Sequence, residues 1–194
     1  EKFIFDYEYA TVGIPYGEVE ADTGNRVAVV GGGPAGLAAA ERLRRLGHAV
    51  RVYDANPFPG GLLLYGIPAF KLSKGRVVRK VEQLQSIGIE FIPNVRIGQD
   101  IPLQELIESF DAVFIGTGAS VESPARWEGA DLDGVYNATE YLIRANVPIE
   151  LQPPALAAKG LPHVGEHVYV IGGGDTAMDC VRTAIRQGAQ SVKC

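Results

Sequence analysis

Two glycine-rich turns are the parts of this chain whose residue types and spacing could do chemistry. The first is Gly31-Gly-Gly-Pro-Ala-Gly36, after the apolar run Val27–Val30, and the second is Gly172-Gly-Gly-Asp-Thr-Ala177, after Val168–Ile171. Each turn follows a strand-like apolar stretch and precedes a segment with helical spacing, which is the context that a dinucleotide-binding turn requires. Two such turns in order indicate a protein that holds two dinucleotides and moves electrons between them.

In the first turn, the residues that match the Gly-x-Gly-x-x-Gly fingerprint are Gly31, Gly33 and Gly36. The first glycine makes the tight bend, the second lets the backbone approach a pyrophosphate, and the third allows close packing of helix and strand. The helix N-terminus adds free N–H groups and a positive dipole end. Asp54 follows about 20 residues further on, where a carboxylate accepts hydrogen bonds from a ribose 2′-OH. A glycine turn without a ligand is the alternative, and this agreement disfavours it.

In the second turn, Gly172, Gly174 and Ala177 match the Gly-x-Gly-x-x-Ala form of the fingerprint. Asp175 and Thr176 stand at the helix start, where short polar side chains can cap free N–H groups. An anionic Asp175 is unfavourable beside a pyrophosphate, so we expect it to cap or orient. The alternative is that this turn only opens a helix.

The elements that must position these turns alternate along the chain. Strands are expected at residues 27–30, 49–53, 89–92 and 111–116, the last of them buried, and helices at residues 37–46, 77–87, 102–107 and 138–145. This order predicts an α/β fold of tandem Rossmann-like units with parallel sheets, the second unit truncated. We expect an extended arm at 1–25, a first dinucleotide-binding domain at 26–120, a connector at 121–165 and the start of a second domain at 166–194. Alternating aromatics at residues 3–9 suit an edge strand, for packing or for docking a partner.

Composition excludes several classes of protein. The 194 residues are 46% hydrophobic and 21% charged, as in ordinary globular proteins, and the net charge of -5 argues against broad nucleic-acid binding. The apolar stretch at residues 27–40 is too short and too interrupted by glycine and proline to span a bilayer, so no membrane partner is expected. No signal peptide is visible at the first residue, and the two cysteines form no Cys-x-x-Cys pair. A cytoplasmic protein is expected.

No catalytic side chain and no metal ligand is predicted. His163 and His167 have helical spacing, but proline and glycine around them favour a loop, and the order of the intervening residues differs from that of a metalloprotease. The chain has no Gly-x-Ser-x-Gly nucleophile elbow. Cys180 is expected to be a small buried hydrophobe, and Arg182 and Arg186 share a helix face where they are expected to be solvated or paired.

Three segments together indicate a family. Gly60–Leu72, Asp111–Gly118 and Gly172–Arg182 closely resemble the glutamate synthase small subunit, and the same module is similar to the FAD/NADPH-binding part of dihydropyrimidine dehydrogenase. The resemblance runs from about Arg26 to the end of the sequence, and the Gly60–Leu72 run is its most specific part.

The resemblance implies FAD at the first turn and NAD(P)H at the second. In it, a loop carries Gly61 and Leu62 to the flavin, Val95 flanks the adenine, and Thr117 with Gly118 marks the turn out of the flavin domain. The residues that it assigns to FAD are Gly31, Gly33, Pro34, Ala35, Gly36, Asp54, Gly61, Leu62, Val95 and Gly118, and those that it assigns to NAD(P) are Gly172, Gly174, Asp175, Thr176 and Ala177. A plain hydrophobic hairpin is the alternative for residues 62–70. Lys71 either places a positive charge near reduced flavin or lies on the surface.

The implied function is electron input. Hydride would pass between nicotinamide C4 and flavin N5 in a dry site, with no acid–base side chain, and electrons would pass to iron–sulfur clusters of a partner, or in reverse. Residues 1–25 lack the cysteines that precede the FAD turn in the glutamate synthase small subunit, so we expect the clusters in other subunits. A partner such as a tungsten aldehyde oxidoreductase complex fits this expectation.

Other functions remain open. One is the glutamate synthase small subunit proper, and another is a non-catalytic FAD-binding assembly subunit. A disulfide reductase would need paired redox cysteines, which are absent from the sequence. The second unit has one helix and a short strand beyond its turn, so we expect a fragment or an incompletely described subunit.

Overall fold

The computed structural model describes residues 18–119 and 127–194. The strand that was expected from the aromatic alternation at residues 3–9 lies outside the described residues. Directly before the first strand, the N–H of Gly24 donates to Asp22 Oδ1 at 2.9 Å, and Gly24 has a φ of +74°. None of the described helices is long and apolar enough to cross a membrane.

A four-stranded parallel sheet forms the first unit, with strand order β3-β2-β1-β4. Its strands are β1 (Arg26–Val30), β2 (Ala49–Tyr53), β3 (Glu90–Ile92) and β4 (Ala112–Ile115). In the register, Val27 pairs with Val50 on one side and with Ala112 on the other. Central β1 is buried from Val27 onward because it has a paired neighbour on both sides and helices on both faces.

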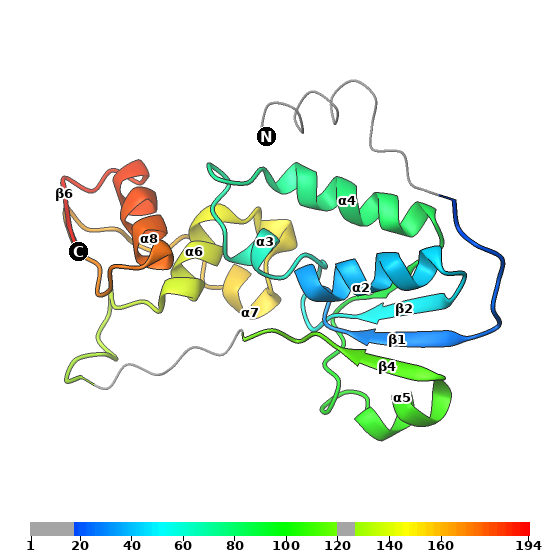
Figure 1. Ribbon diagram of the computed structural model, residues 1–194. Coiled ribbons are helices and arrows are strands. Elements are labelled where there is room, and N and C mark those ends of the chain that lie inside the picture. Colours follow the sequence, from blue (N-terminus) through cyan, green and yellow to red (C-terminus); the bar gives the residue numbers. More distant parts are fainter. Residues whose placement is uncertain (1–17, 120–126) are drawn as a thin grey trace.

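Helices α2 (Pro34–Arg45) and α4 (Lys74–Ser86) cover one face of this sheet, and α5 (Leu103–Ser109) lies toward the other (Figure 1). Apolar residues at helical spacing face the sheet, as predicted, and α4 ends just before Gly88, which has a φ of +93°. The buried core on the α2–α4 side consists of Val29, Leu37, Ala40, Val50, Val52, Val81, Leu84 and Ile89. The smaller core on the α5 side consists of Ala28, Val30, Tyr53 and Leu106.

Residues 112–115 form strand β4, as predicted, but the prediction that this strand is buried is wrong. β4 is an edge strand of the described sheet and pairs only with β1 within it. As a result, the side chains of Phe114 and Ile115 are exposed, by 38% and 59%. The apolar sequence of β4 therefore reflects strand propensity, because no second strand of the described residues pairs with its outer edge.

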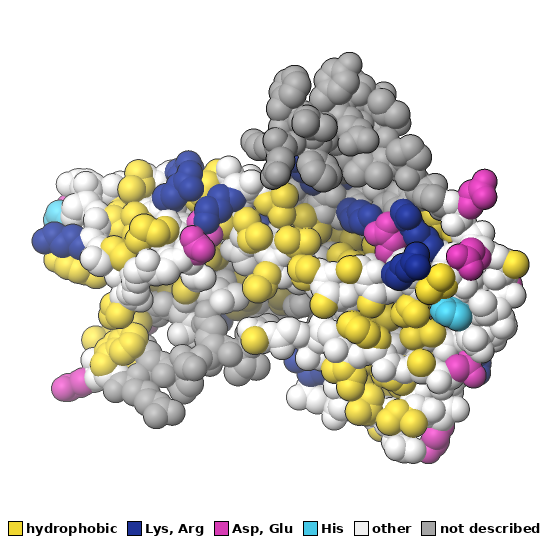
Figure 2. Space-filling model, viewed as in Figure 1, with side chains coloured by type: hydrophobic (Ala, Val, Ile, Leu, Met, Phe, Trp, Pro, Cys, Tyr) yellow, Lys and Arg dark blue, Asp and Glu magenta, His cyan; other side chains and the backbone are white. Residues whose placement is uncertain are grey.

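Short helices fill the middle of the molecule. They are α3 (Leu62–Tyr65), α6 (Ala138–Asn146), the 3₁₀ helix η1 (Ile149–Leu151) and α7 (Pro154–Ala157). The helix expected at residues 138–145 is confirmed as α6, which packs on both units. Ile143 and Val147 join Leu64 and Tyr65 of α3 in one core, whereas Tyr141 and Leu142 pack on Cys180. Figure 2 shows apolar side chains across the middle of this face, with Lys and Arg gathered toward its two ends.

The second unit consists of β5 (His167–Tyr169), α8 (Asp175–Arg186) and β6 (Ser191–Lys193), in which the two strands pair in parallel. Cys180 is buried on α8, as expected, and so are Ala177 and Ala184. The chain thus has two successive strand–turn–helix units with parallel sheets, the second much smaller than the first (Figure 1). The predicted tandem α/β class is confirmed.

Candidate functional site

The first glycine turn lies at the carboxyl ends of β1, β2 and β4. The N–H of Gly31 donates to the carbonyl of Tyr53 at 2.8 Å, and the N–H of Gly116 donates to the carbonyl of Val30 at 2.8 Å. Gly31 has a φ of +100°, and a Cβ added to it would lie 2.5 Å from the carbonyl oxygen of Gly116. Only glycine fits there, because both the backbone conformation and the space exclude a side chain.

The start of α2 offers an open anion site beside this bend. Gly33 is the N-cap, no side chain bonds the helix N-terminus, and Pro34 fills the first helical position. The first-turn N–H groups of a helix have no acceptor within it, and here they belong to Ala35 and Gly36. Among residues 18–119 and 127–194, apart from its chain neighbours, the only atom within 4 Å of a Cβ added to Gly33 would be Gly61 Cα at 3.8 Å. Free donors, a positive dipole end and open space are what a phosphate needs.

The Pro/Gly-rich loop that precedes α3 lies directly on the turn. The N–H of Gly60 donates to the carbonyl of Gly32 at 2.7 Å. Gly61 has a φ of +51°, and a Cβ on it would lie 2.7 Å from Gly33 Cα. Leu62, the next residue, is 55% exposed and begins α3, so the alternative of a plain hairpin at residues 62–70 is wrong. The structure therefore brings Gly61 against Gly33, with Leu62 next to it along the chain.

Asp54 is fixed beside the turn by its own hydrogen bonds. It is 6% exposed, and its Oδ2 accepts from the N–H of Gly32 at 2.7 Å. Its Oδ1 accepts from the backbone N–H of Asn56 at 2.8 Å and from Asn56 Nδ2 at 3.1 Å. A carboxylate has about four lone-pair sites, so three donors leave capacity for a ribose hydroxyl. The sequence analysis missed Asn56, although an Asn two residues after an Asp is a common turn signal.

The remaining residues assigned to FAD lie at the same edge of the sheet. Val95 is half-buried, and its N–H donates to the backbone carbonyl of Asp54 at 2.9 Å. Thr117 and Gly118 are exposed just beyond β4, and Gly118 has a φ of +68°; a Cβ on it would meet no atom of the described residues within 4 Å. β4 adjoins β1, so this exit segment lies next to the glycine turn.

Two side chains that the sequence analysis missed hold the loop in shape. Lys74 is 7% exposed, and its Nζ donates to the carbonyls of Leu63 and Ile67, the former at 3.2 Å. Burial lowers the pKa of Lys74 to about 8. The available signal was its position, since a lysine at the first residue of a helix opposes the helix dipole.

Tyr65 is the second of these side chains. Its hydroxyl donates to the carbonyl of Phe58 at 3.1 Å and accepts from the N–H of the same residue at 3.2 Å. Burial raises the pKa of Tyr65 to about 12, and the charge of Asp54 adds to the rise. Tyr65 and Lys74 therefore fix both halves of the loop around Gly60 and Gly61.

The second glycine turn is far more open. Gly172 has a φ of +133°, and a Cβ on Gly174 would meet no atom within 4 Å in the part of the chain that the structure describes. Residues 172–176 are exposed, and only Ala177 is buried. The predicted capping by Asp175 and Thr176 is wrong, because Gly174 is the N-cap of α8 and no side chain bonds the helix N-terminus. Asp175 is instead the first residue of the helix, where its charge favours the dipole.

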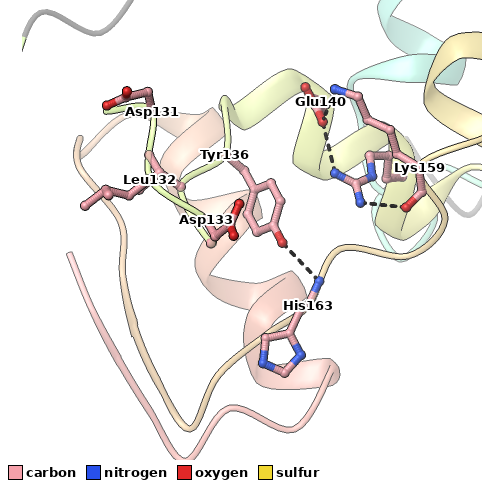
Figure 3. Close-up of a pocket in the computed structure, with 10 residues that line it drawn as sticks. Asp131, Leu132, Asp133, Tyr136, Glu140, Lys159 and His163 are labelled. Carbon is pink, nitrogen blue, oxygen red and sulfur yellow. Dashed lines mark hydrogen bonds and ion pairs between the residues drawn. The ribbon is translucent and has the colours of Figure 1, made fainter. Parts of the chain in front are cut away.

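Two hollows lie away from the first turn. One, of about 670 Å³, is shown in Figure 3 with Asp131, Tyr136, Glu140, Lys159 and His163 around it. Its charges bond one another, since Glu140 accepts from Lys159 Nζ and Arg144 Nη1, both at 2.9 Å, and the N–H of His163 donates to Tyr136 Oη at 3.2 Å. Burial would raise the pKa of Glu140, but these two cations lower it overall. This mutual pairing is what a structural salt-bridge cluster requires.

The other hollow, of about 910 Å³, is mainly apolar and lies between α6, β5 and α8. Tyr141, Tyr169 and Cys180 contribute to its walls. Neither of these two hollows includes a glycine of the first turn in its lining.

Comparison with known proteins supports the two-turn architecture. A family model described as pyridine nucleotide-disulphide oxidoreductase matches residues 25–193. The chain belongs to this family. Its two cysteines, Cys180 and Cys194, are not joined in a disulfide.

Among curated members and relatives, the chain is 44% identical to a putative NADPH glutamate synthase small chain of Cereibacter sphaeroides, covering 100% of this chain and 46% of that protein. It is 42% identical to the NADPH glutamate synthase small chain of Escherichia coli K12, covering 41% of it, and 43% identical to the putative oxidoreductase AegA of the same organism, covering 29% of it. The chain spans less than half the length of these relatives.

Solved structures share the fold. FprA of Mycobacterium tuberculosis in complex with NADPH superposes with a TM-score of 0.66 at 26% identity, over 81% of this chain and 36% of FprA. A 2-naphthoyl-CoA reductase superposes with a TM-score of 0.62 at 22% identity, over 92% of this chain and 24% of that chain. The second likeness concerns the fold alone. The fold of this chain thus has counterparts among solved oxidoreductase structures.

Proposed function

We propose that the first turn binds FAD and that the protein is an FAD-dependent NAD(P)H oxidoreductase that feeds electrons to a partner. The observation that carries the proposal is the contact of Gly60–Gly61 with Gly32–Gly33, which builds a side-chain-free cradle beside the open N-terminus of α2. The proposed ligands are those that the sequence analysis named, from Gly31 to Gly118. We also propose the domain boundaries at residues 26–120, 121–165 and 166–194.

The residues of this chain would bind and orient the cofactor. The first-turn N–H groups of α2 would hold the pyrophosphate, and Asp54 would accept from the adenosine ribose. The apolar α3 would exclude water from the bound flavin, and it begins with Leu62, which is 55% exposed beside Gly61. When bound, FAD supplies the chemistry of accepting a hydride from a reduced nicotinamide. No acid–base side chain is required.

The second turn, from Gly172 to Ala177, is the proposed contribution to the nicotinamide nucleotide site. Support comes from its fingerprint and from the NADPH complex of FprA, which has the same fold. The opening of α8 presents N–H groups that no side chain occupies. An anionic phosphate can therefore approach them.

For the partner, we propose a subunit that carries iron–sulfur clusters. The names of the relatives favour one specific candidate for this protein, the small chain of an NADPH-dependent glutamate synthase, whose partner would be the large chain. A tungsten aldehyde oxidoreductase complex remains the other proposed partner. Glutamate formation with NADPH after mixing with a glutamate synthase large chain would select the first candidate.

The test begins with the flavin. We expect the purified protein to contain FAD, which denaturation releases. We expect anaerobic titration with NADH and NADPH to bleach the visible absorbance of the bound FAD. FAD that dithionite bleaches but neither nucleotide bleaches would overturn the electron-input function and favour a non-catalytic assembly subunit. Protein that takes up no FAD would overturn the assignment of the first turn.

A further inference from the structure

The segment from Gly60 to Leu72, called the flavin loop below, contacts helix α8 of the second unit at its end. Lys71 Nζ lies 2.5 Å from Asp179 Oδ1, an ion-pair distance, and no described residue forms a hydrogen bond to that oxygen. The ring of Phe70 faces the guanidinium carbons of Arg182 at 4.5 Å and Arg186 at 3.9 Å. These three α8 residues are three and four positions apart, so they form one stripe of the helix surface.

The carboxylate of Asp179 is the constrained member of this contact. Its side chain is 8% exposed, whereas that of Lys71 is 34% exposed. A buried carboxylate is costly unless a cation or hydrogen bonds compensate it. Lys71 supplies that cation from a different unit of the chain, so the pair favours one relative position of the loop and the helix.

The two ends of this contact lead directly to the two glycine turns. Upstream of Lys71, the same loop contains Gly60 and Gly61, which contact the first turn. Upstream of Asp179, helix α8 begins at Asp175, immediately after the second turn. The contact therefore connects the backbone that would hold FAD with the helix that would hold the nicotinamide nucleotide.

We propose that Lys71 and Asp179 are positioning residues for hydride transfer, an inference that rests on the proposed function. Their ion pair, supported by Phe70 between the two arginines, sets the distance between the bound flavin and the bound nicotinamide. Rates of such reactions depend steeply on the placement of the reacting atoms, so a small displacement of α8 slows the transfer. Without Lys71, Asp179 has Arg182 as its next cation along the helix, and pairing with it would draw Arg182 away from Phe70.

The experiment compares Lys71→Met, Asp179→Asn and the double variant, each loaded with FAD. Stopped-flow mixing with NADPH, and separately with NADH, gives the limiting rate of flavin reduction and the nucleotide concentration at half that rate. We expect each single variant to lower the limiting rate about fivefold while it retains FAD. The double variant should be no slower than either single variant, because both remove the same pair.

Two further variants separate positioning from general destabilisation. Lys71→Arg keeps the cation and should restore most of the rate. Lys80→Met is the matched control, since Lys80 forms an ion pair with Glu41 at 2.7 Å within the first unit, and it should leave the rate unchanged. Because Lys71 is partly exposed, its variants are expected to fold even if Asp179→Asn does not.

Normal reduction of the wild-type flavin together with unchanged rates in Lys71→Met would overturn this inference and leave the proposed function standing. Additive losses in the double variant would also overturn it, since independent effects exclude a shared contact. A wild-type flavin that neither nucleotide reduces would overturn the proposed function and the inference with it.

Discussion

A Cβ added to Gly36 would lie 1.8 Å from the carbonyl oxygen of Gly31. The third fingerprint glycine is thus required by contact of helix α2 with the backbone of its own turn. We expect Gly36→Ala to force the turn and helix apart, to lower the free energy of unfolding by about 2–4 kcal/mol and to abolish FAD retention. Chemical denaturation and the flavin content of the purified variant measure both effects.

Gly165→Ala is the control for Gly36→Ala. A Cβ at Gly165 would meet only His167 O, at 3.9 Å, an ordinary contact. This variant should keep the stability and flavin content of the wild type. If Gly36→Ala also kept the stability and flavin content of the wild type, the close packing of α2 on the Gly31 carbonyl would be contradicted.

Asp54→Asn tests the acid beside the first turn. The amide can accept from only one of its two terminal atoms, so either Gly32 N–H or the Asn56 donors lose their partner. We expect the Kd for FAD to rise at least about tenfold, as for the loss of a charge-assisted hydrogen bond. Asp111→Asn is the matched control, because Asp111 Oδ2 also accepts from a backbone N–H, that of Arg26 at 2.7 Å, at the end of β1 opposite the turn. An equal Kd in both variants would contradict the role of Asp54.

Lys74 gives the stability a defined pH dependence. Its pKa in the folded protein is about 8, against 10.5 for an ordinary lysine, so between these values the native state binds fewer protons than the unfolded state. The free energy of unfolding should therefore receive a rising contribution from Lys74 as pH increases across this window, by at most about 3 kcal/mol. The neutral amine still has two N–H donors for Leu63 and Ile67.

Denaturation curves between pH 7 and pH 10 measure this contribution, with Lys74→Met as the variant. The difference in the free energy of unfolding between wild type and Lys74→Met should change with pH. A constant offset for Lys74→Met would mean that the folded protein does not bury the ammonium as described.

Tyr65→Phe tests the closure of the flavin loop. The change leaves the N–H and the carbonyl of Phe58 without their shared partner, so we expect a loss of about 1–2 kcal/mol in the free energy of unfolding. Tyr169→Phe, at a residue that is 71% exposed, should cost nothing measurable. Equal stability of the two variants would argue that solvent reaches Phe58.

Most of the first unit could be predicted because its signals are local. The apolar spacing of Leu37 and Ala40 and the glycine at position 47 give α2 and its end, and the run from Ala49 to Tyr53 gives β2. The cradle of Gly31, Gly33 and Gly61 follows from the same fingerprint and loop. These features depend on a few neighbouring residues, which is why one sequence was sufficient.

The errors concern features that depend on distant parts of the chain. The exposure of β4 follows from its place at the sheet edge, which its apolar sequence does not encode. The roles of Lys74, Asn56 and Asp179 depend on partners that the fold brings together, such as Lys71 on the flavin loop for Asp179. The capping error at Asp175 is a shift of one residue, since Gly174 takes the N-cap position.

Transfer of hydride from nicotinamide to flavin is the central claim, and one measurement tests it most directly. FAD-loaded protein is mixed anaerobically with NADPH or NADH that carries either hydrogen or deuterium at the transferred C4 position, and flavin bleaching is timed. The account predicts that at least one nucleotide bleaches the flavin, with a slower rate for the deuterated form. A flavin that stays oxidised with both nucleotides, yet is bleached by dithionite, would contradict it.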